Sequence, residues 1–241
     1  MPGNFKVDVA GTLMTSLVYY CSLDETNLGV TTLIEESNSG PNCTIEGTVS
    51  AITGTLNGAK SFDGVGTNRI QNTTTAATSA VNNYTMAAWI RPGVLPYTGI
   101  AVMNGRDDGA TSPFNGFGIG QSGSGLQIFF GGVGSFAPGF TFANTTDWKH
   151  IIMQRSSGTT SCYVNNVLQG TTSGTAPVAG TAFAIGTARN AGYIWNGGVD
   201  EVGVWTKVLS AQERTDLYNG GVGNEFTPAN PIELIPSRGV T

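Results

Sequence analysis

The chain of 241 residues has few charged side chains and no concentration of basic ones. Aspartate, glutamate, lysine and arginine together make up 11% of the sequence, lysine occurs only four times, and the formal net charge is −5. Nucleic-acid binding depends first on basic side chains that neutralise phosphates. Because no run of lysine or arginine occurs anywhere, we expect no nucleic-acid partner.

Histidine and cysteine are also scarce. His150 is the only histidine, and the cysteines are Cys21, Cys43 and Cys162, with no Cys-x-x-Cys pair. A zinc site would need more histidines or cysteines than the chain has. A Ser-His or Cys-His nucleophile would have to use His150, which lies inside a strand-like run and is expected to pack there. An odd, sparse cysteine count predicts buried free thiols, with a Cys21–Cys43 disulfide as the alternative.

Long apolar stretches are absent as well. No segment approaches the roughly 20 apolar residues that a membrane-spanning helix needs. Residues 1–6 contain no charged region followed by an apolar segment, and this argues against a conventional secretory signal peptide. We therefore expect no membrane association, and a location on a virion surface or outside the cell by another route.

Glycine, in contrast, is abundant at 35 residues, and it helps to separate many short strand-like runs. Short strands bounded by turn residues indicate a sandwich or barrel, and such folds often reach this length as one domain. The clearest runs cover residues 16–23, 83–91, 114–120, 125–131, 147–155, 160–165, 181–186 and 198–206.

The remaining segments define the expected domain organisation. Ser210 and Glu213 form the S-x-x-E pattern of a capping box, which predicts one short helix near the C-terminus. Residues 24–58 are polar and irregular, and they predict a long loop. We expect an N-terminal segment over 1–15, one domain over 16–222 and an extended, proline-containing tail over 223–241.

Seven segments occur in a specific order between residues 16 and 220. They are LVYYCSLDE (17–25), AKSFDG (59–64), YTMAAWIRP (84–92), WKHII (148–152), SCYVNNVL (161–168), AIG (184–186) and WNGGVDEVGVW (195–205). This order resembles the laminin-G-like jelly rolls of the concanavalin A-like lectin/glucanase superfamily. The resemblance implies an all-β fold of two antiparallel sheets packed face to face, with one short C-terminal helix. It does not imply one function.

The resemblance also implies one structural calcium ion at the edge of the sandwich. Its ligands would be the carboxylates of Asp24 and Asp200 and the backbone carbonyl of Gly64, since calcium prefers hard oxygen ligands. The alternative is that Asp200 caps a turn or pairs with an arginine.

The spacing of acidic residues argues against hydrolytic activity. Related β-glucanases place catalytic carboxylates two positions apart on one strand, because residues i and i+2 share a face. No two acidic residues in this chain have that spacing, and the four acidic pairs are adjacent, as in Asp200-Glu201. Adjacent residues on a regular strand face opposite ways, so we expect no enzyme of this type.

A glycan site would combine an aromatic ring with planar polar groups. Five residues are expected to supply them from one loop region, although a solvated turn is the alternative: Tyr97, Asn104, Arg106, Asp107 and Asp108.

The sequence thus predicts a non-catalytic binding or adhesion module for glycans or other surface proteins. The alternative is a structural or decoration protein of a phage virion, whose tail over 223–241 docks on capsid or tail subunits. A third interpretation, less favoured than either, is a glycosidase-related enzyme whose carboxylates converge from separate loops.

Overall fold

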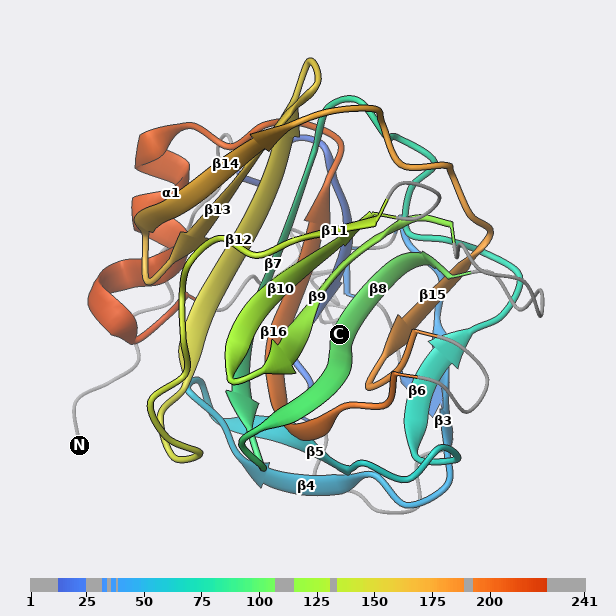
Figure 1. Cartoon of the computed structure of the whole chain (residues 1–241). Coiled ribbons are helices and arrows are strands. Elements are labelled where there is room, and N and C mark those ends of the chain that lie inside the picture. Colours follow the sequence, from blue (N-terminus) through green and yellow to red (C-terminus); the bar gives the residue numbers. More distant parts are fainter. Residues whose placement is uncertain are drawn as a thin grey trace, which may run out of the picture.

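The computed structural model describes residues 13–24, 32–33, 36–37, 39–106, 115–130, 134–188 and 193–224. These residues form two antiparallel sheets packed face to face, with one short helix on the outside (Figure 1). The sequence-based prediction of an all-β sandwich with a C-terminal helix is confirmed. None of the helices in this described part is long and apolar enough to cross a membrane.

Among the described residues, sheet A has eight strands, and β16 lies near its centre. Both β1 and β5 pair with the same edge of β16, and β7 pairs with the other edge. The strands in order are β14 (Val167–Ser173), β13 (Thr159–Val164), β12 (Lys149–Ser156), β7 (Tyr84–Pro92), β16 (Asn196–Trp205), β5 (Gly58–Asp63) and β4 (Ser50–Thr53), with β1 (Leu17–Cys21) beside β16.

Sheet B lies in front of sheet A in Figure 1. Its strands in order are β11 (Gly134–Phe136), β10 (Gly125–Phe130), β9 (Phe117–Gly123), β8 (Tyr97–Arg106), β15 (Ala182–Ile185), β6 (Arg69–Asn72), β3 (Cys43–Glu46) and β2 (Thr32–Leu33). The main core lies between the sheets and contains alternate residues of each strand, such as Ile151 and Met153 of β12.

The helix α1 (Ala211–Tyr218) covers the outer face of sheet A and is followed by a single 3₁₀ turn, Asn219–Gly221. Its Leu217 joins a second apolar cluster with Ile152 and Trp205, which point away from the main core. The predicted capping box is present: Glu213 N donates to Ser210 Oγ at 3.2 Å, and Ser210 N donates to Glu213 Oε2 at 2.7 Å.

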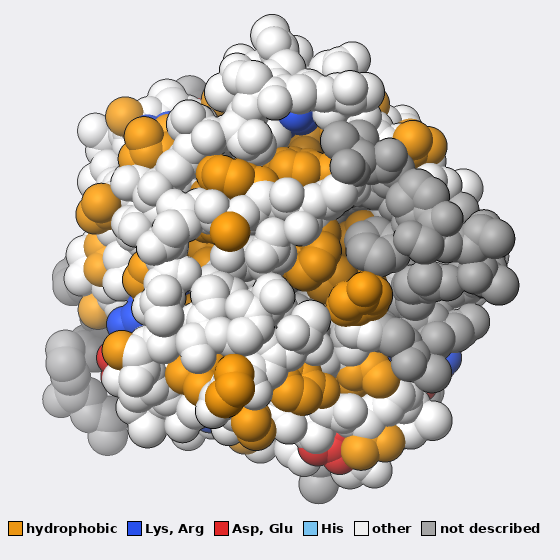
Figure 2. Space-filling model, in the orientation of Figure 1, with side chains coloured by type: hydrophobic (Ala, Val, Ile, Leu, Met, Phe, Trp, Pro, Cys, Tyr) orange, Lys and Arg blue, Asp and Glu red, His pale blue; other side chains and the backbone are white. Residues whose placement is uncertain are grey.

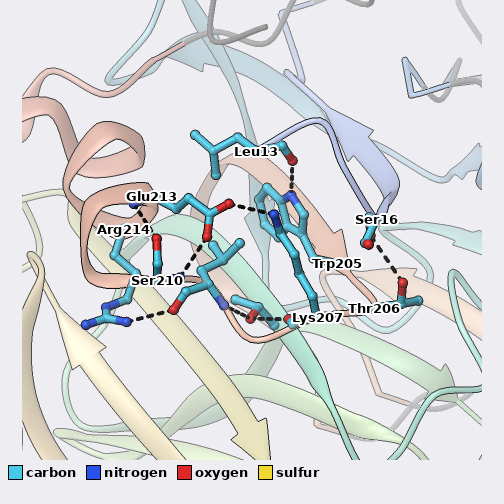
Figure 3. A network of polar contacts seen from close by, with 10 residues as sticks. Leu13, Ser16, Trp205, Thr206, Lys207, Ser210, Glu213 and Arg214 are labelled. Carbon is cyan, nitrogen blue, oxygen red and sulfur yellow. Dashed lines mark hydrogen bonds and ion pairs between the residues drawn. The ribbon is translucent and has the colours of Figure 1, made fainter. Parts of the chain in front are cut away.

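A polar network ties the start of the domain to its end (Figure 3). The indole nitrogen of Trp205 donates to the carbonyl of Leu13 at 2.7 Å, and the hydroxyl of Thr206 donates to the carbonyl of Ser16 at 3.4 Å. Lys207 Nζ pairs with Glu213 Oε1 at 2.6 Å. The last strand is therefore fixed both to the N-terminal segment and to α1.

Two other predictions have clear outcomes. Cys21, Cys43 and Cys162 are free and buried, so the thiol prediction is confirmed and the Cys21–Cys43 disulfide is absent. The single loop expected over 24–58 is wrong, because β3 and β4 lie within it. The four residues of β4 are exposed or half-buried on a sheet edge, so their sequence carries little hydrophobic signal.

Candidate functional site

Three carboxylates meet at an irregularity in the last strand. The register of β16 against β7 shifts between Asp200 and Gly203, and Glu201 adopts a left-handed φ of 50°. Such a bulge re-aims side chains that would otherwise alternate between faces. One oxygen each of Asp24, Asp200 and Glu201 lies within 4.8 Å of the others. The expectation that adjacent acids face opposite ways is therefore wrong at this pair, and we call these three residues the acidic cluster.

Backbone amides of one loop orient two of the carboxylates. Asp200 Oδ2 accepts hydrogen bonds from Thr55 N at 2.7 Å and Leu56 N at 3.3 Å. Asp24 Oδ1 accepts one from Gly58 N at 2.8 Å. Asp24 Oδ2 also accepts from Asn57 Nδ2 at 3.3 Å, so both oxygens of Asp24 are engaged. The donors to Asp200 use one oxygen, which holds that side chain in place while its second oxygen stays available.

The third carboxylate is held in the same way by a tyrosine. The hydroxyl of Tyr20, on β1, donates to Glu201 Oε2. The other oxygens, Asp200 Oδ1 and Glu201 Oε1, are buried and have no hydrogen-bond partner among the described residues. Two buried, unpartnered carboxylate oxygens inside an acidic cluster require a proton or a cation to balance them.

Burial changes the acidity of this cluster. Asp200 is fully buried, and this desolvation, reinforced by the charge of Asp24, raises its pKa to about 7 despite the amides of the loop. Burial and the charge of Asp200 raise the pKa of Glu201 well above its ordinary value. Asp200 and Glu201 therefore resist ionisation unless a positive charge enters the cluster.

The donor set fits a hard divalent cation. All three side chains offer carboxylate oxygens, which suit calcium, and a calcium ion binds oxygens at about 2.3–2.6 Å, so its ligands lie within about 5 Å of one another. Second-sphere hydrogen bonds of the kind made by Tyr20 and the loop amides are common around such sites. Asp24, Asp200 and Glu201 would hold the ion, and Asp24 is the only half-exposed member.

Gly64 does not join this cluster. Asp24 contacts Gly58 at the start of β5, whereas Gly64 follows the last residue of that strand, roughly 20 Å away along an extended chain. A Cβ atom placed on Gly64 would lie 2.9 Å from the Tyr97 hydroxyl and 3.1 Å from Asn196 Nδ2. The structure thus brings Asp24 and Asp200 together and adds Glu201, which the sequence-based prediction missed because the bulge has no sequence signal.

Tyr97, Asn104 and Arg106, which were expected in one glycan-binding loop, belong instead to a strand. Tyr97 begins β8 and Arg106 ends it. Asn104 is 1% exposed, and its amide bonds to both backbone groups of Thr78, accepting at 3.1 Å and donating at 2.9 Å. The single-loop expectation is therefore wrong. Asp107 and Asp108, like the side chain of Arg106, lie outside the described residues.

Tyr97 is close to another set of polar groups, at the edge of the sandwich where β5 ends. Asn196 Nδ2 donates to the Asp63 carbonyl at 3.0 Å, and the Tyr97 hydroxyl approaches Gly64 closely. Partial burial, with the charge of Asp63, raises the pKa of Tyr97. We call Asp63, Gly64, Tyr97 and Asn196 the rim cluster.

The Asp63 carboxylate of the rim cluster is fixed by its own loop. It accepts from Val65 N at 2.9 Å and from Asn68 Nδ2 at 3.0 Å, and the Val65 amide is the main cause of its lowered pKa. The rim cluster therefore presents an ionised carboxylate, an amide and a phenol, all at least partly exposed.

Three solved structures share this architecture. Domain 4 of AbnA, an extracellular GH43 arabinanase from Geobacillus stearothermophilus in complex with arabinotriose, is 18% identical, with a TM-score of 0.65 over 83% of this chain and 97% of that domain. The binding domain of Paraclostridial Mosquitocidal Protein 1 is 14% identical, with a TM-score of 0.65 over 86% of this chain and 52% of that one. Trypanosoma rangeli sialidase in complex with sialic acid is 14% identical, with a TM-score of 0.65 over 88% of this chain and 34% of that one.

At these identities the three structures establish the fold alone, and the chain spans about half of the second structure and a third of the third. No curated protein sequence matches the chain. The sequence model of one family, described as the concanavalin A-like lectin/glucanases superfamily, matches residues 63–213, which include most strands of both sheets. The chain therefore belongs to the concanavalin A-like lectin/glucanase superfamily.

Proposed function

We propose that this chain is a non-catalytic module that binds glycans at the rim cluster and holds one calcium ion in the acidic cluster. The observation that carries the proposal is the meeting of Tyr97, Asp63 and Asn196 around Gly64. A sugar is typically recognised by an apolar surface for its ring and by a few oriented polar groups for its hydroxyls. The rim cluster offers both kinds of contact.

The surroundings of the rim cluster favour a neutral, partly apolar ligand. Val65 and Val94 lie beside it and are 51% and 43% exposed. The outer face of sheet B, seen in Figure 2, carries few charged side chains. Domain 4 of AbnA, which is matched over 97% of its length, was solved in complex with arabinotriose, a neutral saccharide. These features support a carbohydrate ligand over a highly charged one.

A binding role is also favoured by the burial of the acidic cluster. Glycoside hydrolysis needs two carboxylates that flank the bond to be cleaved. Asp200 is fully buried and Glu201 is 7% exposed, so a saccharide cannot be flanked by these two groups. Their orientation by loop amides and by Tyr20 is better suited to holding an ion that joins β1, β16 and the loop after β4.

Glycan-array screening in calcium and in EDTA, followed by calorimetric titration of the best ligand, tests the glycan site. We expect Tyr97→Ala to weaken binding at least tenfold and Tyr193→Ala to leave it unchanged. Tyr193 is a matched control because it is 44% exposed and its ring lies beside that of Phe129 on β10. Failure to bind any glycan in either buffer, or full binding by Tyr97→Ala, contradicts the proposal.

Calcium binding has its own test. Calorimetric titration of EDTA-stripped protein is expected to show one site, and calcium is expected to raise the melting temperature. Asp200→Asn should lose both effects, whereas Asp147→Asn, which changes an exposed acid in another loop, should keep them. The virion role, with docking through 223–241, stays a prediction from the sequence, as does the location of the protein.

A further inference from the structure

A buried arginine lies on the inner face of sheet A, far from the acidic cluster. Arg155 is 3% exposed and lies near the β12–β13 turn, at the top of Figure 1. It is in register with Tyr84 of β7 and Thr160 of β13. It follows Ile151 and Met153 on the face that packs against sheet B. The guanidinium is therefore inside the sandwich, in a row of three side chains across sheet A.

Neutral acceptors satisfy only part of the hydrogen-bonding capacity of this guanidinium. Arg155 donates from Nη1 to Thr160 Oγ1 at 3.1 Å and from Nη2 to the Gly174 carbonyl at 2.6 Å. Among the residues that the structure describes, its buried Nε–H has no hydrogen-bond partner. Arg155 also forms no ion pair with any of these residues. Within the part of the chain that the structure describes, the positive charge is thus hydrogen-bonded but not neutralised.

A second unpartnered donor adjoins the first. Tyr84 is fully buried, and its ring stacks on Phe117 with 3.7 Å between the ring centroids. Its hydroxyl is buried, and no group in the described part of the chain accepts a hydrogen bond from it. Burial raises the pKa of Tyr84, although the charge of Arg155 and the Thr160 hydroxyl act on it in the opposite direction. The phenol therefore keeps its proton and remains a donor next to Arg155.

The charge determines what these donors can bind. An arginine does not lose its proton inside a protein, and a buried charge without a counter-charge is costly. A water molecule would accept from both donors but would leave the charge unbalanced. A carboxylated sugar is excluded by size, because neither Arg155 nor Tyr84 is more than 3% exposed. A small monovalent anion would fit this closed site and would neutralise the charge of Arg155.

We propose that Arg155 and Tyr84 form a binding site for a small monovalent anion, chloride in most solutions. The anion accepts from Arg155 Nε and from the Tyr84 hydroxyl, and it links β7, β12 and β13 at this end of sheet A. This site is separate from the proposed glycan and calcium sites. Its occupancy adds to the stability of the fold, and this contribution grows with the logarithm of the chloride concentration once that concentration exceeds the dissociation constant.

Thermal unfolding at constant ionic strength tests the site, with sodium gluconate replacing sodium chloride. For the unaltered protein we expect the melting temperature to rise by about 3 °C between about 5 and about 200 mM chloride, as for a site that saturates in that range. Tyr84→Phe should reduce this rise and Arg155→Met should abolish it. Arg69→Met, which removes a positive charge paired with Glu46 on sheet B, should retain it.

Equal melting temperatures in chloride and gluconate, or a chloride effect that survives Arg155→Met, would overturn the proposal. Because Arg155→Met is a core substitution that can prevent folding, a second measurement uses the unaltered protein. Crystals soaked in sodium bromide should show an anomalous peak within about 3.5 Å of Arg155 Nε. Absence of that peak, with electron density for a water molecule at the same place, also overturns it.

Discussion

The hydroxyl of Tyr20 donates a hydrogen bond to Glu201, and the two residues are 181 positions apart in the sequence. Tyr20 belongs to β1 and Glu201 to the bulge of β16, so this bond links the first and last strands of sheet A where the acidic cluster forms. It leaves the second oxygen of Glu201 free for a cation. The geometry of the cluster therefore depends on a residue that is not itself a ligand.

Tyr20→Phe should weaken calcium binding without removing a ligand. Loss of the phenol leaves both oxygens of Glu201 without a donor, which lowers metal affinity by about 10- to 100-fold in comparable outer-sphere changes and costs about 1–3 kcal/mol of stability. Calcium calorimetry and urea unfolding measure the two effects. Tyr163→Phe, a half-buried tyrosine stacked under Arg214, is the matched control. Equal calcium affinity in Tyr20→Phe and the unaltered protein would rule out this role.

Calcium-free protein should become less stable as the pH rises through the range in which Asp200 ionises. Its pKa is about 7 in the folded chain against an ordinary 3.8, so the native state holds a proton that the unfolded state has released. Stability then falls between about pH 4 and pH 7, by up to about 4 kcal/mol from this group. Calcium should restore the loss, because it favours the ionised carboxylate.

The Asp200 effect is best measured as the difference in unfolding free energy between the unaltered protein and Asp200→Asn, both in EDTA, from about pH 4 to about pH 8. The difference isolates Asp200 from other titrating groups. A difference that does not change with pH would contradict the assignment of a raised pKa to this carboxyl.

His150 should act in the opposite direction at acid pH. It is 2% exposed, and burial lowers its pKa to about 3 from an ordinary 6.5, so the native state excludes a proton that the unfolded state binds. Its contribution is complete above about pH 6.5 and is lost progressively as the pH falls toward about 3. His150→Gln should therefore show a smaller loss of stability between about pH 6.5 and about pH 4 in denaturant titrations. An unchanged acid limb would show that His150 is not responsible.

The predicted helix cap gives a test of the fold that is independent of either site. Ser210→Ala removes the acceptor for Glu213 N, shown in Figure 3, and should cost about 1 kcal/mol. Gln212→Ala, on the exposed side of the same turn, should cost much less. Calcium affinity should not change in either variant. Equal urea midpoints for the two variants would mean that the cap does not stabilise α1.

Features that depend on a few neighbouring residues, such as strands, a helix cap and a turn, could be predicted from the sequence. Short strand-like runs bounded by turn residues revealed β7, β12 and β13, and the serine–glutamate pair revealed the start of α1. Asn165 and Asn166 both adopt left-handed φ values, 49° and 61°, in the turn between β13 and β14. In each case the signal is local, so no knowledge of the rest of the fold is needed.

The candidate sites were harder to predict because they depend on long-range register. Strand β8 was missed since Gly99 and Gly105 within it suggest a loop, although close backbone contacts with Ile194 and Gly116 require glycine at those places. Glu201 joins Asp24 only because β16 bulges at that point. Gly64 lies by Tyr97 and not by Asp24, because β5 separates the two ends of the sandwich.

The proposed glycan site is the rim cluster. Its most direct test is a titration of isotope-labelled protein with the best glycan from the array, followed by backbone amide chemical shifts. We predict that the largest shifts fall on Asp63, Gly64, Tyr97 and Asn196, with small shifts around Tyr193 and the acidic cluster. Largest shifts at another part of the sandwich, or no shifts with any glycan, would contradict the account.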